Sequence, residues 1–149
     1  MRKFKFTLQS LYNYKQTVEK LQKADLSKAQ QALQMLQAEE QRLIQAQVDT
    51  KISLDEALKK GENVVAALAE HDAYFRFLRD AIVEVRAKIV RAEDIVRRCQ
   101  EKLITTMREL KAYDKLRAEQ YEQWRMEAQA EEAKNIDDLV SFKVVNEEV

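Results

Sequence analysis

The chain has 149 residues, no proline, one glycine and 35% charged residues, and its 26 basic and 26 acidic side chains cancel to a formal charge of zero. Such a composition contains almost nothing that stops a helix. It disfavours two classes of protein, because a hairpin of long helices buries too narrow a stripe to enclose a catalytic cleft, and a balanced charge does not suit general binding to nucleic acid.

The first arm is expected to run from about residue 8 to residue 58. The preceding Met1–Leu8 has no apolar stretch long enough for a signal peptide, and no later run is long enough to cross a bilayer, so we expect a soluble cytoplasmic chain. Apolar residues recur at steps of three and four, first at Leu11, Tyr14, Val18 and Leu21, then at Leu26, Ala29, Leu33, Leu36 and Leu43. The change of frame near residues 22–26 is a stutter, which predicts reduced supercoiling there.

A reversal of the chain is predicted between residues 53 and 66. Gly61 is the strongest signal in this range, and the two lysines before it suit the C-terminus of a helix. Ser53 and Glu56 match the spacing of a capping box, which predicts a possible short separate helix before Gly61. The second arm is expected to start at Glu62 or Asn63.

The second arm, expected over about residues 63–135, carries the strongest pattern in the chain. Twelve positions alternate at steps of three and four, and only one of them is polar. They are Phe75, Leu78, Ile82, Val85, Ile89, Ala92, Val96, Cys99, Leu103, Thr106, Leu110 and Tyr113. An apolar seam of this length can be shielded from water only by another long helix, so the pattern predicts a coiled coil.

The two arms match in length, which favours an antiparallel hairpin within one chain. The predicted fold class is therefore all-α, with residues 1–149 forming a single two-helix coiled-coil domain. If the turn centres near residue 64, facing residues have numbers that add to about 128. Residues 1–60 carry a charge of +4 and residues 121–149 a charge of −5, so the two ends would attract each other. The last residues lack heptad order and are expected to form a mobile tail.

The sequence contains no constellation that points to catalysis, a metal or a cofactor. It has no glycine-rich phosphate loop and no Ser, His and Asp arrangement that a hairpin could bring together. Cys99 lies on the seam and is interpreted as a small buried residue, and His71 lies one step before Phe75 without a second ligand at a suitable spacing. We therefore expect a protein that is not an enzyme.

Three segments resemble one known family. The opening residues Phe4–Lys15 (FKFTLQSLYNYK) are similar to the N-terminus of the flagellar FliJ family, with its phenylalanine pair, Leu-Gln and aromatic-basic group. The similarity continues through Tyr74-Phe75 with Leu78, Ala81 and Ile82, and through residues 131–142. There Asp137-Asp138 stands where the family commonly has Asp-Glu. The resemblance spans essentially the whole chain.

This resemblance implies a non-catalytic stalk or adaptor of the flagellar type III export apparatus. The implied partners are the hexameric export ATPase, the membrane protein of the export gate and the export chaperones, with no nucleic acid and no insertion into the membrane. The implied location is the cytoplasm, with peripheral association to the cytoplasmic face of the membrane. Two alternatives share the architecture, namely the equivalent stalk of a virulence injectisome and a generic tethering protein.

The resemblance and the pattern together give a set of candidate partner-binding residues. They are Phe4, Phe6, Leu8, Tyr74, Leu78, Ala81, Val85, Tyr121, Trp124, Asp137 and Asp138. Phe4, Phe6, Tyr121 and Trp124 are expected to cluster where the two ends of the hairpin meet. Leu78 and Val85 are also seam residues, so a place in the coiled-coil core suits them better. Tyr74 and Ala81 lie off the predicted seam and are the better candidates for contact with the gate.

Overall fold

A computed structural model describes residues 2–61 and 63–147. It contains two helices, α1 (Gln9–Lys59) and α2 (Val64–Glu147), which pack against each other, and no strand occurs among these residues. The predicted all-α helical hairpin is confirmed. The chain divides into two units, which are described separately. We call them the turn unit (Leu21–Leu103) and the terminal unit (Met1–Lys20 with Ile104–Val149).

The reversal is built by a glycine and an asparagine. Gly61 has a φ of 68°, in the left-handed region, and its N–H donates to the carbonyl of Leu58 at 3.3 Å, so it ends α1 as a glycine commonly does. The side-chain oxygen of Asn63 accepts a hydrogen bond of 3.4 Å from the N–H of Ala66, which caps the start of α2. Ser53 lies inside the continuous α1, so the separate helix suggested by the capping-box spacing does not form. Glu62, the other expected start, lies outside the described residues.

Replacing Gly61 by alanine should lower the free energy of unfolding by about 1 kcal/mol. No atom lies within 4 Å of a Cβ placed there, so the cost comes only from the positive φ. Asparagine tolerates this conformation better, and Gly61→Asn should therefore melt closer to the wild type when both variants are followed by circular dichroism. Equal losses in the two variants would show that backbone conformation does not set the cost.

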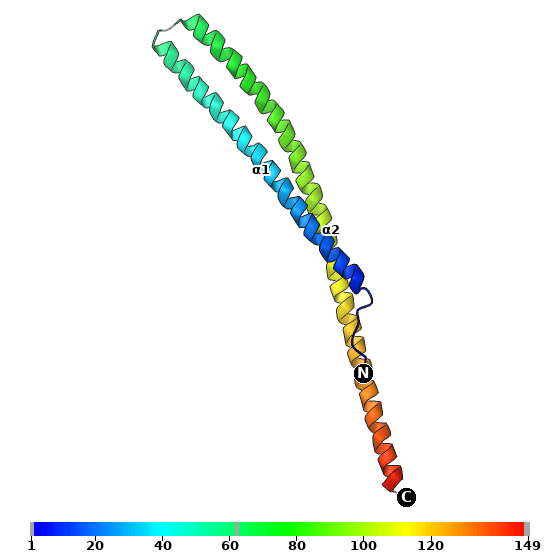
Figure 1. Cartoon of the computed structure of the whole chain (residues 1–149). Coiled ribbons are helices and arrows are strands. Elements are labelled where there is room, and N and C mark those ends of the chain that lie inside the picture. The colour runs from blue at the N-terminus through cyan, green and yellow to red at the C-terminus, as the bar shows by residue number, and fades with distance from the viewer. Residues whose placement is uncertain (1, 62, 148–149) are drawn as a thin grey trace. The chain divides into compact units, whose positions relative to one another are not determined.

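The turn unit has a continuous apolar core. Leu43, Leu78, Ile82 and Val85 form its buried centre, and Leu36, Ile44, Ala46 and Ala81 pack against it. Figure 1 shows α1 and α2 side by side in this unit. Across both units, every one of the twelve predicted seam positions of α2 is buried or half-buried, so this part of the pattern is confirmed. The later frame of the first arm, from Leu26 to Leu43, is confirmed in the same way.

The earlier frame of the first arm is wrong. Leu11, Tyr14 and Leu21 are 49%, 63% and 62% exposed, and Val18 is half-buried. The residues that face α2 are instead half-buried and mostly polar. They are Tyr12, Lys15 and Glu19 in the terminal unit and Gln22 in the turn unit. For Tyr12 and Lys15 the reason lies in α2, which offers each a polar partner, as the site below shows.

The register of the hairpin is fixed by polar pairs between the helices. Three of them join α2 to the N-terminal region within the terminal unit, namely Thr7 with Gln120, Tyr12 with Asp114, and Lys15 with Glu109. In the turn unit, Arg86 binds Glu40 with an N–O distance of 3.1 Å. The residue numbers in each pair add to slightly less than the expected 128. The arms therefore face each other nearly as predicted.

The two ends of the chain take different forms in the terminal unit. Residues Arg2–Leu8 precede α1 without helical structure, and we call them the N-terminal strap. The other end stays helical, because α2 continues to Glu147, past the boundary expected near residue 135. Each described residue after Ala128 is exposed. We call residues 131–147 the C-terminal extension. Its mobility stays a prediction.

Neither α1 nor α2, over the part of the chain that the structure describes, contains a stretch long and apolar enough to cross a bilayer.

Candidate functional site

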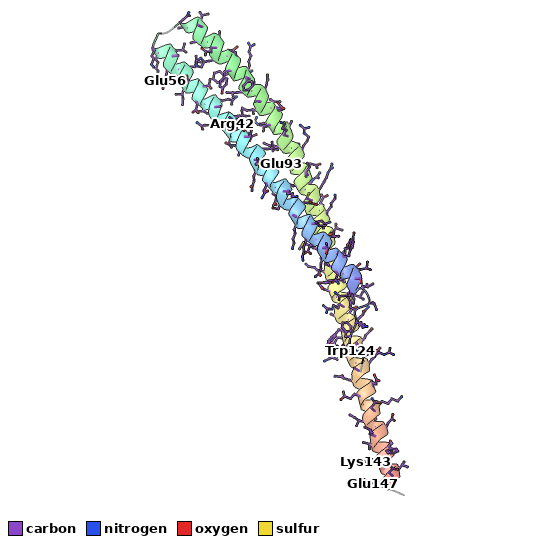
Figure 2. The ribbon with its side chains drawn as sticks, viewed as in Figure 1. Arg42, Glu56, Glu93, Trp124, Lys143 and Glu147 are labelled. Atoms are coloured by element: carbon purple, nitrogen blue, oxygen red, sulfur yellow. The ribbon has the colours of Figure 1, made fainter. Side chains whose placement is uncertain are left out.

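The N-terminal strap packs on an aromatic face of α2. The ring centre of Phe4 lies 5.3 Å from that of Tyr121, with the rings nearly perpendicular, and 6.0 Å from that of Trp124. The indole Nε1 of Trp124 donates a hydrogen bond of 3.1 Å to the carbonyl oxygen of Arg2. Figure 2 labels Trp124 on the part of α2 beside which the N-terminal segment runs. Phe6 is only 7% exposed. The expected aromatic cluster therefore forms around Phe4, while Phe6 is buried.

The alternation of residue types explains how the strap binds. In an extended segment successive side chains point to opposite sides. Phe4 is half-buried and Phe6 buried, whereas Lys3, which precedes Phe4, and Lys5, between the two phenylalanines, are exposed. Burying a phenylalanine fully stabilises a fold by about 1.5 to 3 kcal/mol, so the two rings supply most of the attachment. Leu8, the last residue of the strap, is half-buried and its carbonyl accepts the N–H of Tyr12 at 2.9 Å.

The part of α2 next to the strap is acidic. Between residues 119 and 132 it carries five carboxylates and one basic side chain, which are Glu119, Glu122, Glu127, Glu131, Glu132 and Arg125. A hollow of about 520 Å³ lies at the N-terminal end of the strap, and Arg2, Trp124, Glu127, Ala128 and Glu131 line it. The carboxylates that line this hollow, Glu127 and Glu131, lie near the positive Arg2, which is a favourable arrangement of charge, whereas Arg117 lines another hollow, beside Phe4.

The seam next to the strap is held by polar contacts. Tyr12 donates a hydrogen bond of 2.8 Å from its hydroxyl to a carboxylate oxygen of Asp114, and its ring meets Tyr113 edge to face with centres 6.5 Å apart. Lys15 pairs with Glu109 at 2.5 Å. The hydrogen bond to Asp114 is the main cause of a raised pKa of the Tyr12 phenol, since the bond requires the protonated form.

The variant Tyr12→Phe should remove from the titration a phenol whose pKa lies above the ordinary tyrosine value. The Tyr12 pKa lies above its ordinary value of 10.0, so the bond to Asp114 contributes its full stability below about pH 10 and loses it as the pH rises through the folded-state pKa. Absorbance at 295 nm between pH 8 and pH 13 measures the phenolates. Loss of a phenol that titrates at or below pH 10.0 would contradict the assigned hydrogen bond.

The turn unit presents a second aromatic pair. Tyr74 and Phe77 stack with ring centres 6.2 Å apart and planes 20° from parallel, and Phe77 is 63% exposed. Sequence reasoning named Tyr74 and missed Phe77. The signal was available, because residues three apart on a helix share a face and neither residue lies on the seam. Two adjacent, largely exposed aromatic rings are typical of a protein-binding surface.

The other turn-unit candidates belong mainly to the core. Leu78 is 1% exposed and Val85 is buried, as expected of seam residues. Ala81 is half-buried and packs against the same cluster, although the sequence placed it off the seam. The structure therefore supports a packing role for all three residues. Of the candidates in this unit, Tyr74 has the most accessible side chain.

A polar hollow of about 360 Å³ lies beside Tyr74. It is lined from α1 by Asp49, Thr50 and Ser53 and from α2 by Glu70, His71 and Tyr74. The Nδ1 of His71 lies 2.7 Å from the carbonyl oxygen of Ala67, which can only accept, so this nitrogen carries the proton. Within residues 2–61 and 63–147, no three His, Cys, Asp or Glu side chains are grouped so that they could hold a metal ion.

The C-terminal extension carries the remaining candidates on a fully exposed helix. Asp137 and Asp138 are both accessible. Six large apolar side chains are also exposed along it, namely Ile136, Leu139, Val140, Phe142, Val144 and Val145. Figure 2 shows Lys143 and Glu147 on this part of α2. Charged and apolar side chains are thus both available to a partner.

Comparison with known proteins gives one match. The model of a family described as "Flagellar FliJ protein" matches residues 4–148, nearly the whole chain. No significant similarity to a curated protein or to a solved structure is found. The match includes both aromatic surfaces described above and the whole C-terminal extension.

Proposed function

Because the chain belongs to the flagellar FliJ family and is a non-enzymatic component associated with flagellar protein export, we propose that it is a stalk of the export ATPase. In this proposal the terminal unit binds the hexameric ATPase and favours its assembly or one of its catalytic states. A stalk can do this only if its contacts differ between those states, since equal affinity for all of them would shift nothing. Family membership favours the flagellar system over the virulence injectisome and over a generic tether.

One observation carries the proposal. The C-terminal extension is a helix with every described side chain exposed, and it combines apolar residues with Asp137 and Asp138. Isolated soluble proteins seldom expose so much apolar surface on one element unless a partner covers it. Tyr121 and Trp124 lie on the same helix, between this extension and the seam, and they complete the proposed contact surface.

Two further partners follow in the same proposal. The stacked pair of Tyr74 and Phe77 contacts the export gate, and the chain assists the handling of complexes between chaperones and export substrates. Binding to a gate in the membrane would hold the protein at the cytoplasmic face of the membrane without insertion into it. The exposed aromatic rings support the gate contact, because aromatic residues dominate the energetics of many protein interfaces.

The ATPase contact is tested by two truncations that separate its parts. A chain ending at Asn135 keeps the strap and its contacts on Trp124 but loses both aspartates and the exposed apolar group, whereas a chain ending at Gln120 also loses Tyr121 and Trp124. We expect full-length protein to bind the cognate ATPase and to change its ATP hydrolysis or hexamer assembly. The shorter chains should lose this effect in steps, with at least a tenfold weaker affinity for the chain ending at Gln120.

The control is circular dichroism, which should show the turn unit still helical in both truncated chains. If full-length protein neither binds the ATPase nor alters its hydrolysis or assembly, the stalk proposal is wrong. If the chain ending at Asn135 acts like the full-length protein, residues 136–147 have no part in the contact, and the candidates that this chain retains remain, Tyr121 and Trp124 among them.

A further inference from the structure

We propose that the face of α2 beneath the N-terminal strap is a binding site for an extended segment of a partner in which aromatic and basic residues alternate. In the free protein the strap occupies this site as a ligand supplied by the same chain. The partner's segment binds by displacing it. The inference uses only contacts within the terminal unit and holds whichever protein supplies the segment.

The strap shows which ligand chemistry the face accepts. From Lys3 to Phe6 its sequence alternates positive charge and aromatic rings, and Phe4 is half-buried and Phe6 buried against the rest of the unit. The face supplies matching groups. Tyr121 and Trp124 receive Phe4, and the indole of Trp124 supplies a hydrogen bond to the backbone of the bound segment. The face thus recognises both a side chain and the backbone of an extended ligand.

Charge selects a basic ligand over an acidic one. Glu127 and Glu131 line the hollow at the N-terminal end of the strap, together with Arg2. Glu132 lines the next hollow along α2, while the basic Arg117 lies at the other end of the face, beside Phe4 and Asp114. An acidic segment would therefore meet repulsion at the end of the face that holds Arg2, whereas a basic segment is attracted there.

The site extends beyond the strap. A second hollow, of about 280 Å³, is lined by Ala128, Glu131, Glu132 and Asn135, and it shares Ala128 and Glu131 with the first. The two hollows follow one another along α2, toward its C-terminal end. A segment a few residues longer than the strap could therefore make additional contacts that the strap does not make, which is what a competing ligand requires.

The attachment of the strap suits exchange. The strap is not helical, and its hydrogen bonds to α2 are the one from Trp124 and a contact at 3.4 Å between Gln120 and Thr7, near the limit for such a bond. Apart from these hydrogen bonds, the packing of Phe4 and Phe6 holds the strap on α2. A tethered ligand acts at an effective concentration in the millimolar range, so the strap excludes weak competitors and yields to a ligand that binds more tightly.

The test removes the strap and supplies it again as a separate molecule. One variant lacks residues 1–7 and begins with an initiating methionine before Leu8. A second keeps the full chain but carries Phe4→Ser and Phe6→Ser, so that a site is available even if the first variant folds poorly. The probe is a labelled synthetic peptide with the sequence of residues 2–8, RKFKFTL. Fluorescence anisotropy measures its binding, and Trp124, the only tryptophan in the chain, reports occupancy of the site by its emission.

We expect the peptide to bind both variants at least tenfold more tightly than the full-length wild type, because the wild-type site is already filled. Binding should restore the wild-type emission of Trp124. Control peptides with serine in place of both phenylalanines, or with glutamate in place of the arginine and lysines, should bind at least tenfold more weakly. Circular dichroism should confirm that both variants remain helical.

Three results would overturn the proposal. The first is that the peptide binds neither variant although both are helical. The second is that the peptide binds the wild type as tightly as the variants, which would place its binding site elsewhere. The third is a wild-type dimer that becomes monomeric when the strap is removed, which would assign the site to the strap of a second copy. The assay contains no ATPase, so its failure and the failure of the stalk proposal are distinguishable.

Discussion

Replacing Leu78 by alanine is expected to lower the free energy of unfolding by about 3 kcal/mol, the largest effect of any single truncation in the turn unit. Leu78 is 1% exposed, the most buried of the large apolar side chains, and it lies at the centre of the cluster with Leu43, Ile82 and Val85. Its removal loses the transfer free energy of the side chain and leaves a cavity that the surrounding side chains close only in part.

Urea unfolding followed by circular dichroism measures this loss. Val83→Ala is the matched control, because Val83 lies five residues further along α2 and is 65% exposed, so its truncation should change stability by less than about 0.5 kcal/mol. A loss at position 78 no larger than the loss at position 83 would show that the side chain is not in the core. That outcome would reopen a role for Leu78 as a surface contact.

The double variant Tyr74→Ser and Phe77→Ser should weaken binding to the export gate by at least about tenfold while leaving thermal unfolding nearly unchanged. Both rings are largely exposed and stack on each other, so they contribute little to the hairpin and much to any protein that covers them. Loss of two adjacent aromatic anchors commonly costs more than 1 kcal/mol for each ring when the interface is dry.

Binding to the purified cytoplasmic part of the gate protein is the measurement. Val83→Ser with Val90→Ser provides a matched control, because these two side chains are as exposed as Phe77 but lie seven residues apart on another side of α2. The control should bind like the wild type. If the aromatic variant also binds like the wild type, the gate contact does not use this surface.

The seam of the second arm was predictable because only one helical frame over these residues is consistently apolar. Twelve positions alternate at steps of three and four with a single polar member, and no other frame over the same residues is as apolar. Burial of all twelve follows from geometry, since a helix repeats its faces at that spacing. The lengths of the arms then brought Phe4 near Tyr121 and Trp124, so the aromatic cluster of the strap was predictable as well.

The start of α1 was not predictable from its own pattern. The apolar frame through Leu11 and Tyr14 competes there with a polar frame through Tyr12 and Lys15, and hydrophobic periodicity alone favours the first. The structure adopts the polar frame because α2 offers partners to it. Asp114 accepts a hydrogen bond from the hydroxyl of Tyr12, and Glu109 forms an ion pair with Lys15. Such pairs depend on residues about a hundred positions away, which one arm cannot show.

The strap also has a consequence for the order in which the molecule can form during synthesis. Glu40 and Arg86 are separated by 46 residues, whereas the hydrogen bond between Arg2 and Trp124 joins residues 122 positions apart. Closing the shorter loop costs less entropy, so pairing begins near Gly61 and proceeds toward the ends. Phe4 and Phe6 leave the ribosome well before Trp124 and reach the aromatic face of α2 only after Trp124 has followed. For most of translation, two phenylalanines among basic residues are therefore available to chaperones that bind nascent chains.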